Sequence, residues 1–184
     1  MFTLNEKVVY PGHGVAKINR IVEKKVGDSI TRFFELEFLN KDMTILVPMH
    51  GLTSVGIRRL SSNDSINEIF RLLSEPANKI PYELTASNWN KRNKEYQGKI
   101  RTGNIGEICK IYRDLKNIAI YKELSFGEKN LLNQTEGLLV EEIALVTQVN
   151  HDQAVEHLRS LLFKNVNNNA MAMPIKARAT VATV

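Results

Sequence analysis

Trp89 is the only tryptophan of this chain, and it lies in the polar, basic segment Asn88-Trp89-Asn90-Lys91-Arg92-Asn93-Lys94. A buried indole usually has apolar neighbours at helical spacing, whereas here the neighbours are amides and cations. A flat ring beside cations is suited to stack on bases, or to wedge a base step while the cations hold phosphates. In a helix Trp89, Arg92 and Tyr96 would share one face, so packing of that face against another helix is an equally good interpretation.

Positive charge is concentrated around this segment. The chain has a formal net charge of +5. Nine lysines and arginines accompany three acidic residues between Thr85 and Lys122, whereas two accompany seven between Glu123 and Phe163. Such a distribution indicates either a nucleic acid or other polyanion as partner, or simply a solvated surface.

The other residues that commonly carry chemistry form no catalytic or metal-binding pattern. His13 lies between two glycines of a turn, and neither His13 nor His50 has Cys, Asp or Glu at ligand spacing, while His151 and His157 suit helix caps and surface positions. Cys109 is the single cysteine, which leaves no disulfide framework, and its helical neighbours predict a half-buried small residue. We therefore expect no catalytic residues, no enzyme activity, no cofactor, no metal and no small-molecule substrate.

Composition places the chain among globular proteins. Of its 184 residues, 43% are hydrophobic and 24% are charged, which is enough for one domain or two small ones. No apolar run approaches the roughly 18 residues of a membrane span, and the segment Met1–Lys7 lacks the apolar core of a signal peptide. We expect a cytoplasmic monomer without a membrane partner.

Residues 1–60 show the period-two pattern of β-strands. Phe34, Leu36 and Phe38 alternate with glutamates, which places one face in a core and one in water. Five short strands are expected, at residues 7–10, 15–23, 34–38, 43–47 and 55–57. Tight turns between them predict a small, strongly bent barrel of SH3 or Tudor type. The strand 43–47 is mainly uncharged and is expected either at an edge that a partner strand could extend or in the interior of the barrel.

After Leu60 the apolar spacing becomes helical. Four or five helices are expected: one opened by a capping box at Ser65–Glu68, one from about Asn88 to Ile100, one opened by Asn104 with Glu107, one opened by a capping box at Ser125–Glu128, and one from His151 to Phe163. From Asn165 the composition shows no periodicity, which predicts a mobile tail. The fold class is thus α+β, with a β module at 1–60, a helical module at 61–164 and a tail at 165–184.

Several motifs, in this order along the chain, resemble the CarD/CdnL family of bacterial transcription regulators. They are Lys7–Gly14, Val47-Pro48, Val55–Arg58, Asn88-Trp89 followed by Lys91, Arg92 and Lys94, and Leu124–Lys129. The resemblance covers residues 2 to about 162. Its Tyr-Pro-x-His-Gly turn also occurs in the related polymerase-binding module of the transcription-repair coupling factor, and the tryptophan-bearing helical half distinguishes the two.

The resemblance implies a non-enzymatic transcription factor that is associated with the nucleoid through RNA polymerase. The β module would bind the polymerase β subunit, and the helical module would reach promoter DNA near the −10 element, at the upstream edge of the melted bubble. There the tryptophan would wedge into the minor groove and stabilise the open complex. The implied DNA-binding residues are Trp89, Lys91, Arg92, Lys94 and Lys129, and the implied polymerase-binding residues are Lys24, Lys25, Thr44 and Leu46.

The chain departs from some family members on the polymerase side. Certain relatives have arginine where Leu46 stands, and another arginine near Lys24 or Lys25. Main-chain strand pairing would preserve the binding mode without the first of these charges. Two other functions stay open from the residues alone: a protein-interaction adaptor with a Tudor-like barrel and a core Trp89, and a general RNA-binding protein that needs no polymerase.

Overall fold

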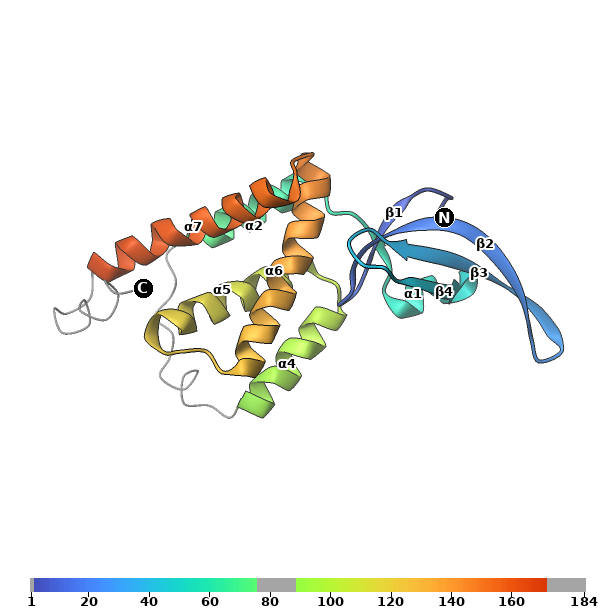
Figure 1. Ribbon diagram of the computed structural model, residues 1–184, viewed down its shortest axis with the longest axis horizontal. Helices are drawn as coiled ribbons and strands as arrows, with labels where there is room; N and C mark the ends of the chain where they lie inside the picture. Colours follow the sequence, from blue (N-terminus) through green and yellow to red (C-terminus); the bar gives the residue numbers. More distant parts are fainter. Residues whose placement is uncertain (1, 76–88, 172–184) are drawn as a thin grey trace.

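The computed structural model describes residues 2–75 and 89–171, with side chains described as far as Leu162. An antiparallel sheet built from the first 59 residues is followed by a set of longer helices (Figure 1). The predicted α+β fold class, with the sheet first and the helices after it, is confirmed.

The sheet contains five strands: β1 (Lys7–Tyr10), β2 (Gly14–Val26), β3 (Ser29–Phe38), β4 (Thr44–Pro48) and β5 (Arg58–Arg59). Their order is β4-β3-β2-β1-β5, and every neighbouring pair is antiparallel. Among the described strands β4 and β5 are the two edges and do not pair, so the sheet is open where we expected a small, strongly bent barrel. It remains compatible with a Tudor-like arrangement, since a bulge between Ile18 and Arg20 bends β2.

The predicted strand at residues 55–57 is wrong. A short 3-10 helix, Met49–Gly51, continues into helix α1 (Leu52–Val55). Gly56 ends α1 with a φ of +80°, and its backbone N–H donates to the carbonyls of Leu52 and Thr53. A left-handed glycine that closes a helical turn cannot continue an extended strand, so β5 begins only at Arg58.

The β module has its own hydrophobic core. The predicted alternation in β3 is confirmed, because Phe34, Leu36 and Phe38 are all buried, and they pack with residues of β1, β2, β4 and α1. β2 and β3 are both longer than predicted and continue as a two-stranded hairpin that extends away from the helices (Figure 1). Val26 and Ile30, at the hairpin tip, are exposed.

The helical module consists of α2 (Asn63–Ser74), α4 (Trp89–Arg101), α5 (Ile105–Tyr121), α6 (Phe126–Thr147) and α7 (His151–Met171). Side chains of Asn104 and Ser125 accept hydrogen bonds from the backbone of Glu107 and Glu128, which confirms the predicted starts of α5 and α6.

Two helix boundaries differ from the prediction. The N-cap of α2 is Ser62, whose side chain accepts from the backbone N–H of Ser65, so the capping box predicted at Ser65–Glu68 is wrong and the helix begins earlier. Helix α7 runs to Met171, past the predicted end at Phe163. The predicted tail therefore begins with helical backbone, and residues 172–184 lie outside the described residues.

A second hydrophobic core lies among the helices. Helix α5 contributes Ile108, Ile111 and Leu115, all nearly inaccessible, and α6 packs along it. Helices α2 and α7 lie side by side (Figure 1). Because α6 reaches from the start of α4 to the sheet, it connects the helical core with the β module.

Candidate functional site

The turn between β1 and β2 packs against the helical module. A β carbon at Gly14, where φ is +108°, would overlap the carboxylate of Glu141 in α6, and that carboxylate accepts the backbone N–H of Val15 at 3.0 Å. A β carbon at Gly103, just after α4, would lie 3.1 Å from Cγ of Pro11. Both glycines have a positive φ, so a side chain at either position would be strained as well as crowded. The turn that resembles the family motif thus forms part of the junction between the modules.

Arg58 and Glu142 form the main ionic contact of this junction. Nη1 and Nη2 of Arg58 donate to the two carboxylate oxygens of Glu142 at 2.6 and 2.8 Å, and Nε donates to the carbonyl of Gly103 at 2.8 Å. Glu142 is 3% exposed and also accepts the backbone N–H of Ser61 at 2.8 Å. A bidentate arginine–carboxylate pair restricts both distance and orientation, so it fixes the angle between β5 and α6.

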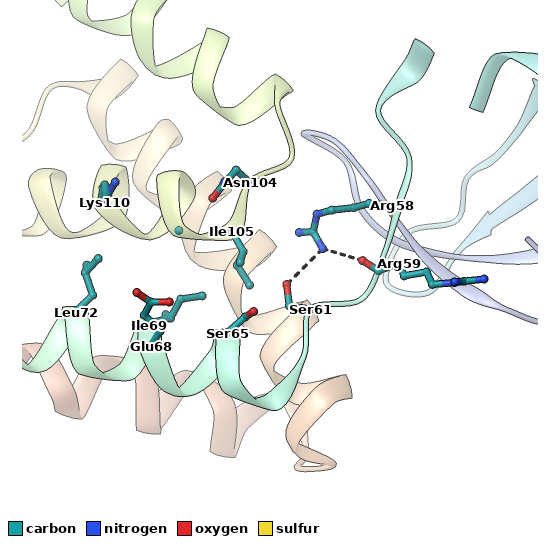
Figure 2. Close-up of a pocket in the computed structure, with 11 residues that line it drawn as sticks. Arg58, Arg59, Ser61, Ser65, Glu68, Ile69, Leu72, Asn104, Ile105 and Lys110 are labelled. Carbon is teal, nitrogen blue, oxygen red and sulfur yellow. Dashed lines mark hydrogen bonds between the residues drawn. The ribbon is translucent and has the colours of Figure 1, made fainter. Parts of the chain in front are cut away.

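An open hollow of about 440 Å³ lies beside this contact, between α2 and the start of α5 (Figure 2). Figure 2 shows Arg58 directed toward Ser61 and the backbone of Arg59, with Lys110 on the opposite side. The arginine is engaged by protein groups, and Lys110 pairs with Glu107 at 2.6 Å. Arg58 and Lys110 are therefore already paired with other protein groups and offer little uncompensated charge to a ligand in the hollow.

The described residues give no support to metal or thiol chemistry. Within residues 2–75 and 89–162, no group of three or more His, Cys, Asp or Glu side chains could hold a metal ion. Cys109 is fully buried, more so than predicted, and burial raises the pKa of its thiol to about 12. His13 is part of the β1–β2 turn, with its ring 5.0 Å from that of Tyr10, as suits a structural role.

Trp89 is the first residue of α4, is half-buried, and packs against the hydrophobic core of the helices. The edge of the indole that carries Nε1 lies over Gly127 in the first turn of α6, where a β carbon would be 3.0 Å from Nε1. The guanidinium of Arg92 lies 5.5 Å from the ring centre, within the range of a cation–π contact. The ring is therefore held from two sides by neighbouring groups.

Arg92, which the resemblance implies to be a DNA-binding residue, lies inside the protein. Arg92 is 5% exposed, and its Nη2 donates to Oε1 of Glu128 at 2.5 Å. Because residues three apart share a helix face, the face of α4 that carries the indole toward α6 also carries Arg92 into the protein. Its charge supports the site from inside and is not available to phosphates.

Glu128 is a connecting point of this site. Besides Arg92, its carboxylate accepts the Nζ of Lys122 at 3.0 Å, and the backbone N–H and hydroxyl of Ser125, each at 2.9 Å. Burial by itself would raise the pKa of Glu128, but the Ser125 hydrogen bonds and Lys122 outweigh it and hold the pKa below the ordinary value. The ionised carboxylate thus fastens α4, the α5–α6 loop and the start of α6 together.

The three predicted DNA-binding lysines are exposed. Lys91 and Lys94 lie on the solvent side of α4. Lys129, two residues beyond the glycine that supports the indole, is 53% exposed and pairs at 2.8 Å with Glu123, which is itself 87% exposed. Pairs between such exposed side chains are weak, so Lys129 can exchange its partner at little cost. The site therefore brings together Trp89 and these lysines, while their contact with DNA remains a prediction.

The predicted polymerase-binding residues fall on two parts of the sheet. Lys24 and Lys25 are exposed near the hairpin tip, opposite Thr31 and Ile30. Thr44 and Leu46 lie on β4, which among the described strands pairs only with β3. The strand predicted as either edge or interior is thus an edge in the described sheet.

A cation that sequence reasoning did not select, Arg20, lies in the same row as Leu46, two strands away. Leu46 is opposite Glu35 in the ladder, and Glu35 is opposite Arg20, so the three form one row across β4, β3 and β2. Arg20 donates to both carboxylate oxygens of Glu35 at 2.9 Å and is 68% exposed. The row that contains Leu46 therefore carries a cation on β2.

Sequence reasoning also missed the junction between the modules. Val15 and Glu141 are 126 residues apart, and Arg58 and Glu142 are 84 apart, so no local pattern connects them. The only signal is the pair of glycines around His13, which indicates an unusual backbone but not what approaches it. Phe126, within the Leu124–Lys129 motif, is 81% exposed.

No helix among the described residues combines the length and apolar character needed to cross a membrane.

Two family models match the chain: the CarD-like/TRCF RID domain over residues 2–61, and the CarD C-terminal domain over residues 68–159. The chain is also 26% identical over 155 residues to a Bacillus subtilis (strain 168) protein named "Putative transcription factor YdeB", and the match covers 83% of this chain and 97% of that protein. With both modules matched in order, the chain belongs to the CarD family of transcription regulators.

Proposed function

We propose that the protein binds the β subunit of RNA polymerase through its sheet and stabilises the promoter open complex through Trp89. It would act in the bacterial cytoplasm, at the upstream edge of the melted bubble near the −10 element. The observation that carries this proposal is how Trp89 is held at the start of α4. Its half-buried indole is supported by Gly127 and by the buried Arg92–Glu128 pair, and exposed lysines lie on the same two helices.

A wedge must be rigid as well as apolar. Unstacking a base step costs a few kcal/mol, and a freely rotating side chain would lose further entropy on insertion. Contact with Gly127 on one side and Arg92 on the other restrains the indole before it meets DNA. Both supporting groups contact the indole from the protein side, so they do not compete with bases for the ring.

The lysines around Trp89 supply affinity for phosphates without reading sequence. Lys91, Lys94 and Lys129 are exposed on α4 and α6, on either side of the contact between the helices. Phosphate contacts of this kind are salt-dependent and weak for a small site. The polymerase must therefore deliver the site to the bubble, and tethering raises its effective concentration there.

The sheet offers a surface for that delivery. The side of β4 that pairs with no other described strand can add a strand of the β subunit by main-chain pairing, which does not depend on the side chain at Leu46. Arg20, in the same row as Leu46 but two strands in from this edge, would supply a cation on the neighbouring surface of the sheet, and Lys24 and Lys25 extend positive charge onto the hairpin.

The polymerase contact is tested by binding of the full chain to the isolated β lobe. Arg20→Glu should weaken binding at least about 10-fold, because it replaces a cation that would steer association with a negative charge. Arg32→Glu is the matched control, since Arg32 is also 68% exposed and pairs with a glutamate on the hairpin. Equal binding by wild type and Arg20→Glu would remove the assignment of this row to the interface.

The wedge is tested with Trp89→Ala in an assay of open-complex lifetime on a weak promoter. The variant should bind polymerase as wild type does and shorten the lifetime about 5-fold or more, the value of one lost ring–base contact. Trp89→Phe should retain part of the effect. An unchanged lifetime with the variant bound to polymerase would exclude the wedge.

The junction between the modules connects the two proposed contacts. Arg58–Glu142 and Val15–Glu141 hold the sheet against α6, whose opposite end supports Trp89. Helix α6 acts as a spacer between them, so the distance from the polymerase contact to the bubble edge is set by a single rigid element.

A further inference from the structure

The middle of α6 contains a weak point of the helix. Gly137 lies there, and a glycine inside a helix has more backbone freedom than any other residue. No other described part of the chain comes within 4 Å of its β-carbon position, so close packing does not require a glycine. Thr135 is fully buried, and its hydroxyl donates to the backbone carbonyls of Leu131 and Leu132 at 3.0 and 2.9 Å. Such bonds compete with those of the helix and favour bending.

Glu136, between Thr135 and Gly137, is tied to both neighbouring helices. Its Oε2 accepts the hydroxyl of Tyr112 in α5 at 2.7 Å, and Nζ of Lys116, one turn further along α5, lies 3.8 Å from the same oxygen. From α7, Arg159 donates through Nε to Oε2 at 3.2 Å and through Nη2 to Oε1. The side chain of Glu136 is only 13% exposed. These contacts, which we call the Glu136 latch, join three helices at the weak point.

Apolar packing alone would not fix α6 at this position. The hydrophobic effect is non-directional, so helices held by it can bend or shift with little loss. Hydrogen bonds to a charged carboxylate are directional and stronger than neutral ones. Burial raises the pKa of Glu136, but hydrogen bonds from Arg159 and Tyr112, with the charge of Lys116, outweigh burial and hold the pKa below its ordinary value. The carboxylate is therefore ionised at neutral pH, which keeps the latch closed.

The weak point lies between the two parts of α6 that the proposed function uses. Gly127, which supports the indole, is ten residues before Gly137, and Glu141, which holds the β1–β2 turn, is four residues after it. Ten residues of helix are about 15 Å long. A bend of about 20° at Gly137 would therefore move the start of α6 by about 5 Å. This displacement exceeds the roughly 3.4 Å between neighbouring bases of one strand.

We propose that Glu136 is a positioning residue for the wedge. By tying α5 and α7 to the weak point of α6, it keeps Trp89 at a fixed distance and angle from the polymerase contact. This inference rests on the proposed function of Trp89. The Arg58–Glu142 pair fixes only the end of α6 that meets the sheet, so the latch is needed to fix the course of the helix from there to the indole.

The first measurement is open-complex lifetime with polymerase holoenzyme on a weak promoter. Glu136→Ala removes the latch and should shorten the lifetime about 3-fold, which is part of the value of one ring–base contact. Its binding to the isolated β lobe and its Trp89 fluorescence should equal those of wild type, because the sheet and the Gly127 support of the indole are unchanged.

Two second-site variants separate position from stability. Gly137→Ala stiffens α6 at the weak point and should restore most of the lifetime lost in Glu136→Ala. Gly98→Ala is the matched control, because it makes the same change in α4, where again no described atom lies within 4 Å of the β-carbon position. It adds similar helix stability without changing α6 and should restore nothing. Equal rescue by both would show that Glu136 contributes only stability and would overturn the inference.

Spin labels give a readout that needs no DNA. Glu37→Cys, at an exposed position of β3, and Glu123→Cys, at a position 87% exposed before α6, report the distance between the sheet and the start of α6. Cys109 is fully buried and stays unlabelled. The distance distribution should broaden in Glu136→Ala and narrow again when Gly137→Ala is added. A distribution that Glu136→Ala leaves unchanged would overturn the inference.

The lifetimes separate the failure of this inference from the failure of the proposed function. A shortened lifetime for Trp89→Ala with a normal one for Glu136→Ala would overturn the role of Glu136 and leave the wedge standing. A normal lifetime for Trp89→Ala would overturn the wedge and, with it, the assignment of Glu136 as its positioning residue.

Discussion

Arg92 and Glu128 form an ion pair between α4 and the first turn of α6 in which the two side chains are only 5% and 1% exposed. The arginine lies next to the Trp89 ring, and the carboxylate caps the helix on whose Gly127 that ring rests. One buried contact therefore determines both the start of α6 and the position of the indole. The cation that sequence placed on the DNA side belongs to the internal support.

Glu128→Gln is expected to lower the free energy of unfolding by about 3–5 kcal/mol, because it removes the buried carboxylate charge that pairs with the guanidinium of Arg92. Glu123→Gln is the matched control: Glu123 is close in sequence and also pairs with a lysine, but it is 87% exposed, so its loss should cost less than about 1 kcal/mol. Urea unfolding monitored by circular dichroism measures both. Equal stability of the two variants would contradict the structural role of the buried pair.

Stability should fall in acid partly through Glu128. Its pKa is lowered in the folded protein from an ordinary value of 4.5, so its stabilising contribution is complete above that pH and is lost as the pH falls through the folded value. The stability difference between wild type and Glu128→Gln should therefore be constant near neutral pH and shrink below about pH 4.5. Melting temperatures of both proteins between pH 3 and 7 test this. A difference independent of pH would show that the carboxylate charge is not what stabilises the site.

Gly127→Leu is expected to displace the Trp89 indole, since even a β carbon would lie 3.0 Å from Nε1. The displaced ring should show red-shifted fluorescence and greater quenching by acrylamide. Gly137→Ala is the control on the same helix: nothing lies within 4 Å of its β-carbon position, so this change should leave the fluorescence unaltered. It should also stabilise the helix by up to about 1 kcal/mol. An unmoved emission maximum in Gly127→Leu would contradict the contact.

Arg58→Ala should weaken the junction between the modules while leaving each hydrophobic core intact. The substitution removes a bidentate pair to Glu142, which is 3% exposed. Arg59→Ala is the neighbouring control, because Arg59 is 66% exposed and pairs with Glu6 within the β module. We expect Arg58→Ala to bind the polymerase β lobe normally and to shorten open-complex lifetime. Small-angle scattering should show a broader distribution of shapes for Arg58→Ala alone.

Lys91→Gln combined with Lys94→Gln should reduce the dependence of open-complex stabilisation on salt. Each phosphate contact contributes about 0.9 to the slope of log affinity against log salt, so the slope should fall by up to about 2. Lys99→Gln on the same helix is the control, since Lys99 pairs with Glu95 and Glu107. A slope identical to that of wild type would exclude both lysines from the DNA contact.

Local sequence determined most of the secondary structure. Asn104 and Ser125 cap α5 and α6 because a side-chain oxygen reaches a backbone N–H three residues later, which requires nothing from the rest of the protein. The alternation around Phe34 specified the buried face of β3 in the same way. Where local signals competed, as at Ser62 and Ser65 before α2, the pattern alone did not decide which serine caps the helix.

Only the tertiary structure decided what the charged residues do. A lysine and an arginine in one helical segment look alike in sequence, yet Lys91 is exposed while Arg92 is buried against a carboxylate 36 residues later. Gly14 likewise shows an unusual backbone in sequence, but only folding brings Glu141 over it. The physical reason is the separation along the chain over which each effect acts. Helix caps and periodicity depend on residues within one or two turns of each other. Burial of a charge is tolerated only where a distant part of the chain supplies its partner.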